Sequence, residues 1–319
     1  MAGVWTVAAP ADAGGQTRGV EQLPRVFSVA VARARGVEER RLRSRSEWQR
    51  PYRGIRATSR AQWIDTAAAR VGAVGPDACL FGLSALRAWG LERPGIHPLE
   101  STLHIAVPRP GRAPRGDGIV GYSVGLDPAC VTVWNGARVT TRARTWVDLA
   151  RWLTVPHLVA VGDALCRPDA DACTVSELRA AVVLSPRSRG IAKAREALEL
   201  IVPGAESYPE SELRVAFVRA GLPAPSVNVE VFEGRRMVAR VDLLFEEWGV
   251  VVEYEGAHHA ESRAQWRRDL TRIGDLQRLG YLVERAHADD LRDPTALIHR
   301  IRVHLHRRGW RPGSRVSDA

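Results

Sequence analysis

The segment from Arg240 to Glu255 restricts the fold of this chain more than any other part of the sequence. It reads RVDLLFEEWGVVVEYE, two short apolar runs separated by the turn-forming residues 246–249. Side chains alternate between the two faces of a strand, so Glu253 and Glu255 share one face. If the two runs pair as a hairpin, Asp242 reaches the same end of the sheet as Glu253. The pattern therefore predicts a β-hairpin with carboxylates gathered at one end.

Carboxylates gathered at the end of a sheet are costly unless a positive group joins them. Mg²⁺ takes oxygen ligands, so this pattern is compatible with a site for Mg²⁺ or Mn²⁺. Such a cation can activate water and stabilise the leaving oxygen in phosphodiester hydrolysis, which points to a nuclease. The simpler alternative is a solvated strand end, because short motifs also match by accident.

The residues on either side of the hairpin predict further elements. Ser207 is a plausible N-cap for a helix with Pro209 and Glu210 in its first turn, and Gly221 would end that helix. The downstream elements are expected to be two helices and one strand, at 263–279, 294–307 and 281–285. The expected order is helix, strand, two-stranded hairpin, helix, strand and helix.

This arrangement resembles the small PD-(D/E)XK endonuclease domains related to the very-short-patch mismatch-repair endonuclease. It is more closely similar to the actinobacterial "endonuclease domain-containing" family, domain of unknown function 559. The likeness covers about residues 206–306. The matching residues are Glu210, Arg214, Asp242, Glu253, Glu255, Gly256, His259, Asp269, Arg272 and Gly280.

The resemblance implies roles for several of these residues. Asp242 and Glu253 would ligate Mg²⁺ or Mn²⁺, and Glu210 would complete the acidic cluster. His259 would assist the attacking water or the leaving group. The remaining motif residues would support the site; they are Arg214, Asp269 and Arg272.

One position departs from the pattern of the wider superfamily. That pattern ends with a lysine, and this chain has Glu255 there; its only lysine is Lys193, far upstream. A lysine ammonium would orient the attacking water and offset phosphate charge, which an ionised Glu255 does not do. Either His259, Arg272 or a second metal ion substitutes, or Glu255 marks a domain that no longer cleaves.

The net charge of the 319-residue chain is +10, and it is unevenly distributed. The first sixty residues hold twelve arginines and five acidic residues, whereas the chain from Glu206 onward is close to neutral. A concentrated basic segment attracts polyanions such as DNA and binds them in a salt-sensitive way. A solubilising arginine-rich arm is the alternative.

Residues 23–57 predict a small winged helix-turn-helix. One helix, with Phe27 among its inward residues, ends at Gly36, a second spans about 38–44, and a basic wing strand is expected near 50–56. This outline resembles the N-terminal module of AbiEi-like antitoxins of type IV toxin–antitoxin systems, and a simple packing hairpin is the alternative. The candidate DNA-binding residues are Arg40, Arg41, Arg43, Arg45, Arg53 and Arg56.

Residues 58–203 are expected to form an α+β middle domain, which also resembles the middle region of AbiEi-like proteins. Helices are predicted at 61–71 and from Cys79, a strand at 102–108 and a basic proline- and glycine-rich loop at 108–117. Arg144 and Asp148 are four residues apart, which predicts a pair on a helix surface. No glycine-rich phosphate loop or nucleophile elbow is present in this region.

The expected organisation is α/β (α+β) with five parts. A disordered arm (1–22) and the winged-helix-like module (23–57) precede the middle domain (58–203). A restriction-endonuclease-like mixed sheet flanked by helices (204–309) and a disordered tail (310–319) follow. The four cysteines have no metal-binding spacing and are expected as reduced thiols in the cytoplasm, with no signal peptide or membrane span.

Three functions remain open from the sequence. The first is a metal-dependent DNA endonuclease with an N-terminal DNA-binding module, acting in DNA repair or defence. The second is a non-catalytic AbiEi-like antitoxin or transcriptional regulator with a degenerate nuclease fold, which could have a toxin partner. The third is a scaffold or defence-associated interaction protein.

Overall fold

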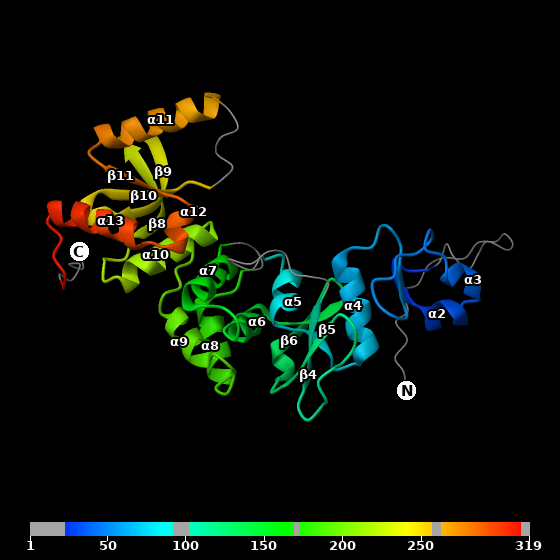
Figure 1. The fold of residues 1–319 in the computed structure, drawn as a ribbon. Helices are drawn as coiled ribbons and strands as arrows, with labels where there is room; N and C mark the ends of the chain where they lie inside the picture. Colours follow the sequence, from blue (N-terminus) through cyan, green and yellow to red (C-terminus); the bar gives the residue numbers. More distant parts are fainter. Residues whose placement is uncertain (1–22, 92–101, 169–171, 257–262, 314–319) are drawn as a thin grey trace. The chain divides into compact units, whose positions relative to one another are not determined.

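The computed structural model describes residues 23–91, 102–168, 172–256 and 263–313, with side chains for all of these except 263–270. Its elements form a mixed α/β structure in which sheets are flanked by helices (Figure 1). The chain divides into two compact units, one of residues 1–80 and 101–139 and one of residues 81–100 and 140–319. This division does not coincide with the expected boundaries at 57/58 and 203/204.

The N-terminal part of the first unit is a two-stranded antiparallel sheet with two short helices. Its elements are β1 (Val26–Ser28), α2 (Val29–Ala34), α3 (Glu39–Leu42) and β2 (Ile55–Ala57). The Ser28 hydroxyl accepts a hydrogen bond from the Val31 amide and so begins α2. Phe27, expected in the first helix, lies in β1 instead, because its ring packs edge-on against buried Trp48.

The rest of the first unit is a five-stranded mixed sheet accompanied by α4. Its elements are α4 (Trp63–Val74), β3 (Cys79–Leu80), β4 (Leu103–Pro108), β5 (Ile119–Val124), β6 (Val131–Trp134) and β7 (Ala137–Thr140). The strand order is β5-β4-β3-β7-β6. The helix expected from Cys79 begins only at Gly82, because Cys79 pairs with β4. Strand β7, whose Val139 pairs with Leu80, was not predicted from the sequence.

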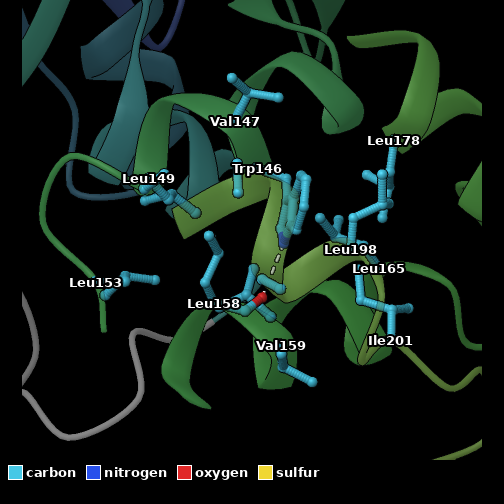
Figure 2. Packing of buried hydrophobic residues seen from close by; sticks show 14 of the residues in the cluster. Trp146, Val147, Leu149, Leu153, Leu158, Val159, Leu165, Leu178, Leu198 and Ile201 are labelled. Atoms are coloured by element: carbon cyan, nitrogen blue, oxygen red, sulfur yellow. Dashed lines mark hydrogen bonds between the residues drawn. The ribbon is translucent and has the colours of Figure 1, made fainter. Parts of the chain in front are cut away.

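The second unit begins with five helices around one buried cluster. They are α5 (Gly82–Ala88), α6 (Arg142–Leu149), α7 (Val155–Leu165), α8 (Val175–Leu184) and α9 (Ile191–Leu198). Trp146 lies at the centre, and its indole N–H donates to the Leu158 carbonyl at 2.8 Å (Figure 2). That bond allows the large ring to be fully buried without an unsatisfied donor.

Arg144 and Asp148 form a buried ion pair, so the expectation of a helix-surface pair was wrong. The Arg144 Nε atom lies 3.0 Å from both oxygens of Asp148, and the two side chains are 5% and 4% exposed. The four-residue spacing was right, but α6 is covered by neighbouring helices. The cysteines agree with the sequence analysis, since all four are buried free thiols.

Gly82→Ala is expected to lower the free energy of unfolding by about 2 kcal/mol. Gly82 has a φ of +50°, and an added Cβ would lie 2.5 Å from Cζ3 of Trp152. Gly72→Ala is the control: Gly72 is exposed in α4 with nothing near its Cβ position, so the same change should stabilise by up to about 1 kcal/mol. Urea unfolding curves would measure both, and equal effects would contradict the prediction.

The C-terminal part of the second unit is a four-stranded mixed sheet with helices on both faces. The elements are α10 (Tyr208–Arg219), β8 (Ser226–Glu233), β9 (Arg236–Phe245), β10 (Val250–Tyr254), α11 (Arg263–Arg278), β11 (Leu282–Ala286), α12 (Ala288–Arg292) and α13 (Thr295–Arg307). The strand order is β11-β10-β9-β8, with β10 and β11 parallel and the other pairs antiparallel. Apart from the extra short helix α12, this is the order of elements that the sequence predicted.

Two separate apolar clusters fix the helices to this sheet. Leu213 and Phe217 of α10 share one cluster with Ile301 of α13, on one face. Leu276 of α11 is buried in the other, on the opposite face (Figure 1). Val215 of α10 belongs instead to the cluster around Trp146. The helix α10 is therefore shared between the sheet and the five preceding helices.

None of the helices within the described residues is both long enough and apolar enough to cross a membrane.

Candidate active site

The β9–β10 hairpin brings Asp242 and Glu253 to opposing positions. The antiparallel ladder pairs Val252 with Leu243, so Asp242 and Glu253 come next and lie across from each other. The Tyr254 amide donates to Asp242 Oδ2 at 2.8 Å, in place of a ladder bond to the main chain. Both carboxylates line one pocket of about 210 Å³. The alternation of strand side chains therefore located this pair correctly.

The Glu253 carboxylate is buried and paired with an arginine. Nη1 and Nη2 of Arg272, from α11, donate to its two oxygens at 2.8 and 2.7 Å. Glu253 is only 8% exposed, and Arg272 is half-buried. A bidentate guanidinium holds a carboxylate in one orientation and offsets its charge. Arg272 thus lies in the candidate site, as the sequence resemblance implied.

Asp242 has a high pKa because little positive charge compensates its burial. Desolvation above all, together with the nearby Glu253 and Glu210 carboxylates, raises the pKa of Asp242 to about 6. The hydrogen bond from the Tyr254 amide and the charge of Arg272 oppose this rise. A nearby positive charge would stabilise the ionised form of this buried carboxyl group. Carboxyl groups with such a perturbed pKa are typical of functional sites.

Glu255 lines the same pocket and is paired with Arg285 of β11. Their closest atoms, Nη1 of Arg285 and Oε1 of Glu255, are 2.8 Å apart. His287 is more distant, with Nδ1 3.6 Å from Oε2 of Glu255. Because β10 and β11 are parallel and Arg285 is the partner of Glu253, the Arg285 side chain is on the face of Glu253 and Glu255. A guanidinium therefore lies in this pocket beside Glu255.

The described residues fit a divalent cation only in part. Asp242 and Glu253 offer carboxylate oxygens in one pocket, and the high pKa of Asp242 favours a cation there. However, both Glu253 oxygens accept hydrogen bonds from Arg272. Within the described part of the chain, no group of three or more histidine, cysteine, aspartate or glutamate residues could hold a metal ion. A complete ligand set would require residues beyond these two.

Glu210 is close enough to affect Asp242 but is not among the residues that line the pocket. Its carboxylate is buried and accepts hydrogen bonds from three donors: the Ser207 hydroxyl at 2.6 Å, the Asn228 amide at 2.8 Å and the Glu206 main-chain N–H at 3.0 Å. These bonds begin α10 and tie it to β8. Glu210 therefore stabilises the local structure in this conformation rather than completing an acidic cluster.

Arg214 does not support the pocket, contrary to the role that the resemblance implied. Its Nη2 atom donates to Asp163 Oδ2 of α7 at 2.7 Å, and both side chains are almost fully buried. The Ser211 hydroxyl donates to the same oxygen at 2.7 Å. The reason is that Arg214 lies on the face of α10 that contacts the preceding helices. His259 and the side chain of Asp269 lie outside the described residues.

The expected DNA-binding arginines of the N-terminal part fall into three groups. Arg56 is half-buried and donates to the Leu42 carbonyl at 2.7 Å, so its expected role in DNA binding does not agree with its position. Arg41 and Arg43 form ion pairs with Glu47 and Glu39. The three that remain are exposed, and among the described residues they have no ion-pair partner; they are Arg40, Arg45 and Arg53.

Two residues with important contacts were not singled out from the sequence: Arg285 of β11 and Asp163 of α7. Arg285 is visible only as an alternating residue of the LVERA strand, and its place beside Glu255 depends on the register of β10 and β11. Asp163 lies in an otherwise apolar helix, VPHLVAVGDAL. A lone acidic residue in such a helix is a signal for a buried partner, since a buried charge is rarely left unpaired.

Comparisons with known proteins found two curated relatives. They are the uncharacterized proteins MT2308 of Mycobacterium tuberculosis (strain CDC 1551 / Oshkosh) and Rv2248 of Mycobacterium tuberculosis (strain ATCC 25618 / H37Rv). Each is 35% identical to this chain over 174 residues, which is 54% of this chain and 64% of the relative. No protein-family model matches the chain, and no solved structure matches it significantly. The chain is therefore similar to these two proteins over about half its length.

Proposed function

We propose that the C-terminal sheet and its helices form a restriction-endonuclease-like domain that hydrolyses phosphodiester bonds in DNA. The observation that carries this proposal is the pocket in which Asp242 and Glu253 oppose each other beside Arg272 and Arg285. Carboxylates can position a cation or a water molecule, and guanidiniums can bind the oxygens of a phosphate. The pocket thus combines both requirements of phosphodiester hydrolysis.

Asp242 and Glu253 are the residues that would hold Mg²⁺ or Mn²⁺. Such a cation, when bound, supplies positive charge at the phosphate and lowers the pKa of its water. Arg272 and Arg285 now pair with Glu253 and Glu255. If these long side chains rotated toward a DNA phosphate, each arginine would exchange its glutamate partner for the phosphate. Arg285 would then offset phosphate charge where the superfamily pattern has lysine.

The test is cleavage of DNA by the purified full-length protein. Supercoiled plasmid, linear duplex and mismatched duplex would be incubated with Mg²⁺, with Mn²⁺ and with EDTA. Cleavage that requires a divalent cation and is lost in Asp242→Asn supports the proposal. Absence of cleavage on all substrates, together with absence of Mn²⁺ binding by calorimetry, overturns it.

Arg285→Gln is expected to slow cleavage by about 100-fold, the typical cost of losing one positioned donor to a developing charge. The change also leaves Glu255 without its closest cation, which would add repulsion toward the phosphate. Arg278→Gln is the matched control, because Arg278 also pairs with a glutamate, Glu233, but does not line the pocket. Single-turnover rates would measure both, and equal losses would show that Arg285 has no special role.

A second candidate is a non-catalytic DNA-binding regulator of the AbiEi-like antitoxin type. It is favoured by the occupied oxygens of Glu253 and by the absence of a larger group of metal ligands among the described side chains. The β1-α2-α3-β2 arrangement would be its winged-helix-like module, with exposed Arg40, Arg45 and Arg53 toward DNA. Tight DNA binding without cleavage under any divalent condition would select this function.

A further inference from the structure

The first unit contains a second, larger pocket that the proposed active site does not use. Its volume is about 670 Å³. The C-terminal half of α4 and the turn at residues 75–78 form one side, and the connection from β4 to β5 forms the other. That connection is the basic loop noted in the sequence. Four arginines and one acidic residue line the pocket; they are Arg70, Arg109, Arg112, Arg115 and Asp77.

The four guanidiniums have few protein partners. No carboxylate within the described ranges lies at ion-pair distance from any of them, and Arg109, Arg112 and Arg115 are exposed. The Nε atom of Arg70 is buried and has no hydrogen-bond partner among the described residues. Since Asp77 is the single acidic residue of the lining, the pocket has a strong excess of positive charge.

The wall of this pocket is tightly built. The Arg70 guanidinium lies over the Tyr52 ring, 5.5 Å from its centroid, which orients it by a cation–π contact. A Cβ atom on Gly116 would lie 2.9 Å from Arg70 Nη2, and one on Gly121 would overlap the Pro114 carbonyl. The loop therefore approaches the Arg70 side chain of α4 closely at Gly116, and its Pro114 approaches β5 closely at Gly121. A pocket formed before its ligand arrives loses less entropy on binding.

We propose that this arginine pocket binds the phosphodiester backbone of DNA. Arginine forks match phosphate oxygens, and a pocket of this volume exceeds one phosphate group. None of its lining residues has an aromatic ring for stacking a base, which favours contact with the backbone without sequence readout. This inference rests on the proposed function only in taking DNA as the ligand.

The test is equilibrium binding of a fluorescein-labelled 20-base-pair duplex to the full-length protein, measured by polarisation in EDTA over a range of NaCl concentrations. Because EDTA prevents cleavage, failure of the nuclease proposal does not affect the result. In Arg109→Gln/Arg112→Gln/Arg115→Gln, affinity should fall by about tenfold or more, and the slope of log K against log salt should become shallower by about 2. The variant with lysine at the same three positions should retain most of the slope of log K against log salt.

The matched control is Arg187→Gln/Arg189→Gln/Arg235→Gln, which removes three exposed arginines of the second unit. Unchanged thermal melting would show that each variant is folded. Equal losses in the control and the pocket variant would indicate general charge attraction and overturn the proposal. An unchanged slope in the glutamine variant would also overturn the proposal. So would a result in which the glutamine variant loses ATP binding but keeps duplex binding.

Discussion

Asp242→Asn is expected to slow DNA cleavage by about 1000-fold or more and to stabilise the protein at about pH 7.5 by about 1–2 kcal/mol. The loss of activity follows from removing the charge that would hold the cation. The gain in stability follows from the pKa of Asp242, which burial raises to about 6. Asparagine has nearly the same shape, and its oxygen can still accept from the Tyr254 amide.

The sign of the stability change follows from proton binding. Because the pKa of Asp242 is higher in the folded protein than the ordinary value of 3.8, the folded state binds the proton more tightly. The stabilising contribution is complete below about pH 4 and is lost as the pH rises through about 6. Asp242→Asn should remove this part of the pH dependence. Half-exposure of the carboxylate reduces the effect below the full value that the pKa shift implies.

Asp148→Asn provides a comparison with the opposite sign. Asp148 is buried too, but the buried guanidinium of Arg144 neutralises its charge at a distance of 3.0 Å. Removing its charge takes away the carboxylate that neutralises the buried Arg144 guanidinium and should cost about 3 kcal/mol. Urea unfolding between about pH 4 and pH 8 would measure both variants. An active Asp242→Asn variant, or one less stable than the wild type at about pH 7.5, would contradict the role assigned to Asp242.

Arg214→Met is expected to lower the free energy of unfolding by about 3–5 kcal/mol. Asp163 would remain buried with only two of its partners, the Ser211 hydroxyl and the Val202 amide. Burial already raises the pKa of Asp163, and the Arg214 charge is the largest opposing influence. Removing Arg214 should therefore raise this pKa further, so that the loss of stability is smaller at low pH.

Two further variants isolate this effect. Asp163→Asn/Arg214→Met should recover part of the loss, because no charge remains buried and the asparagine oxygen can still accept a hydrogen bond. Arg219→Met is the control on the same helix, where Arg219 forms an exposed ion pair with Glu196. That change should cost less than about 1 kcal/mol. If Arg214→Met were equally mild, the buried pair would not stabilise the junction between α7 and α10.

Local signals explain which elements the sequence could predict. Ser207 and Pro209 mark the start of α10, and Gly221 follows its end with a φ of +76°. The hairpin of β9 and β10 was predicted from alternation and a four-residue turn. By contrast, the two-residue strand β3 and its neighbour β7 exist through pairing between distant segments. The position of Phe27 in β1 is likewise determined by its contact with Trp48 and not by helical periodicity.

The same distinction applies to the candidate site. Asp242 and Glu253 are neighbours on one hairpin, so strand geometry was enough to place them together. Arg285 reaches Glu255 through the parallel register of a later strand, which the sequence does not reveal. The motif also could not distinguish Arg272, which faces the pocket, from Arg214, which faces Asp163. Which face of a helix is covered depends on its neighbours.

The shared position of α10 has a consequence for how this protein could evolve. Its Leu213 and Phe217 belong to the sheet, whereas Val215 and Arg214 belong with the preceding helices. A gene fragment that starts near residue 204 would encode every strand of the sheet but would expose half of α10. Recombination that transfers the candidate catalytic region to another protein would therefore have to carry with it the helices packed against α10, above all α7. The portable genetic unit is larger than the set of residues that perform the proposed chemistry.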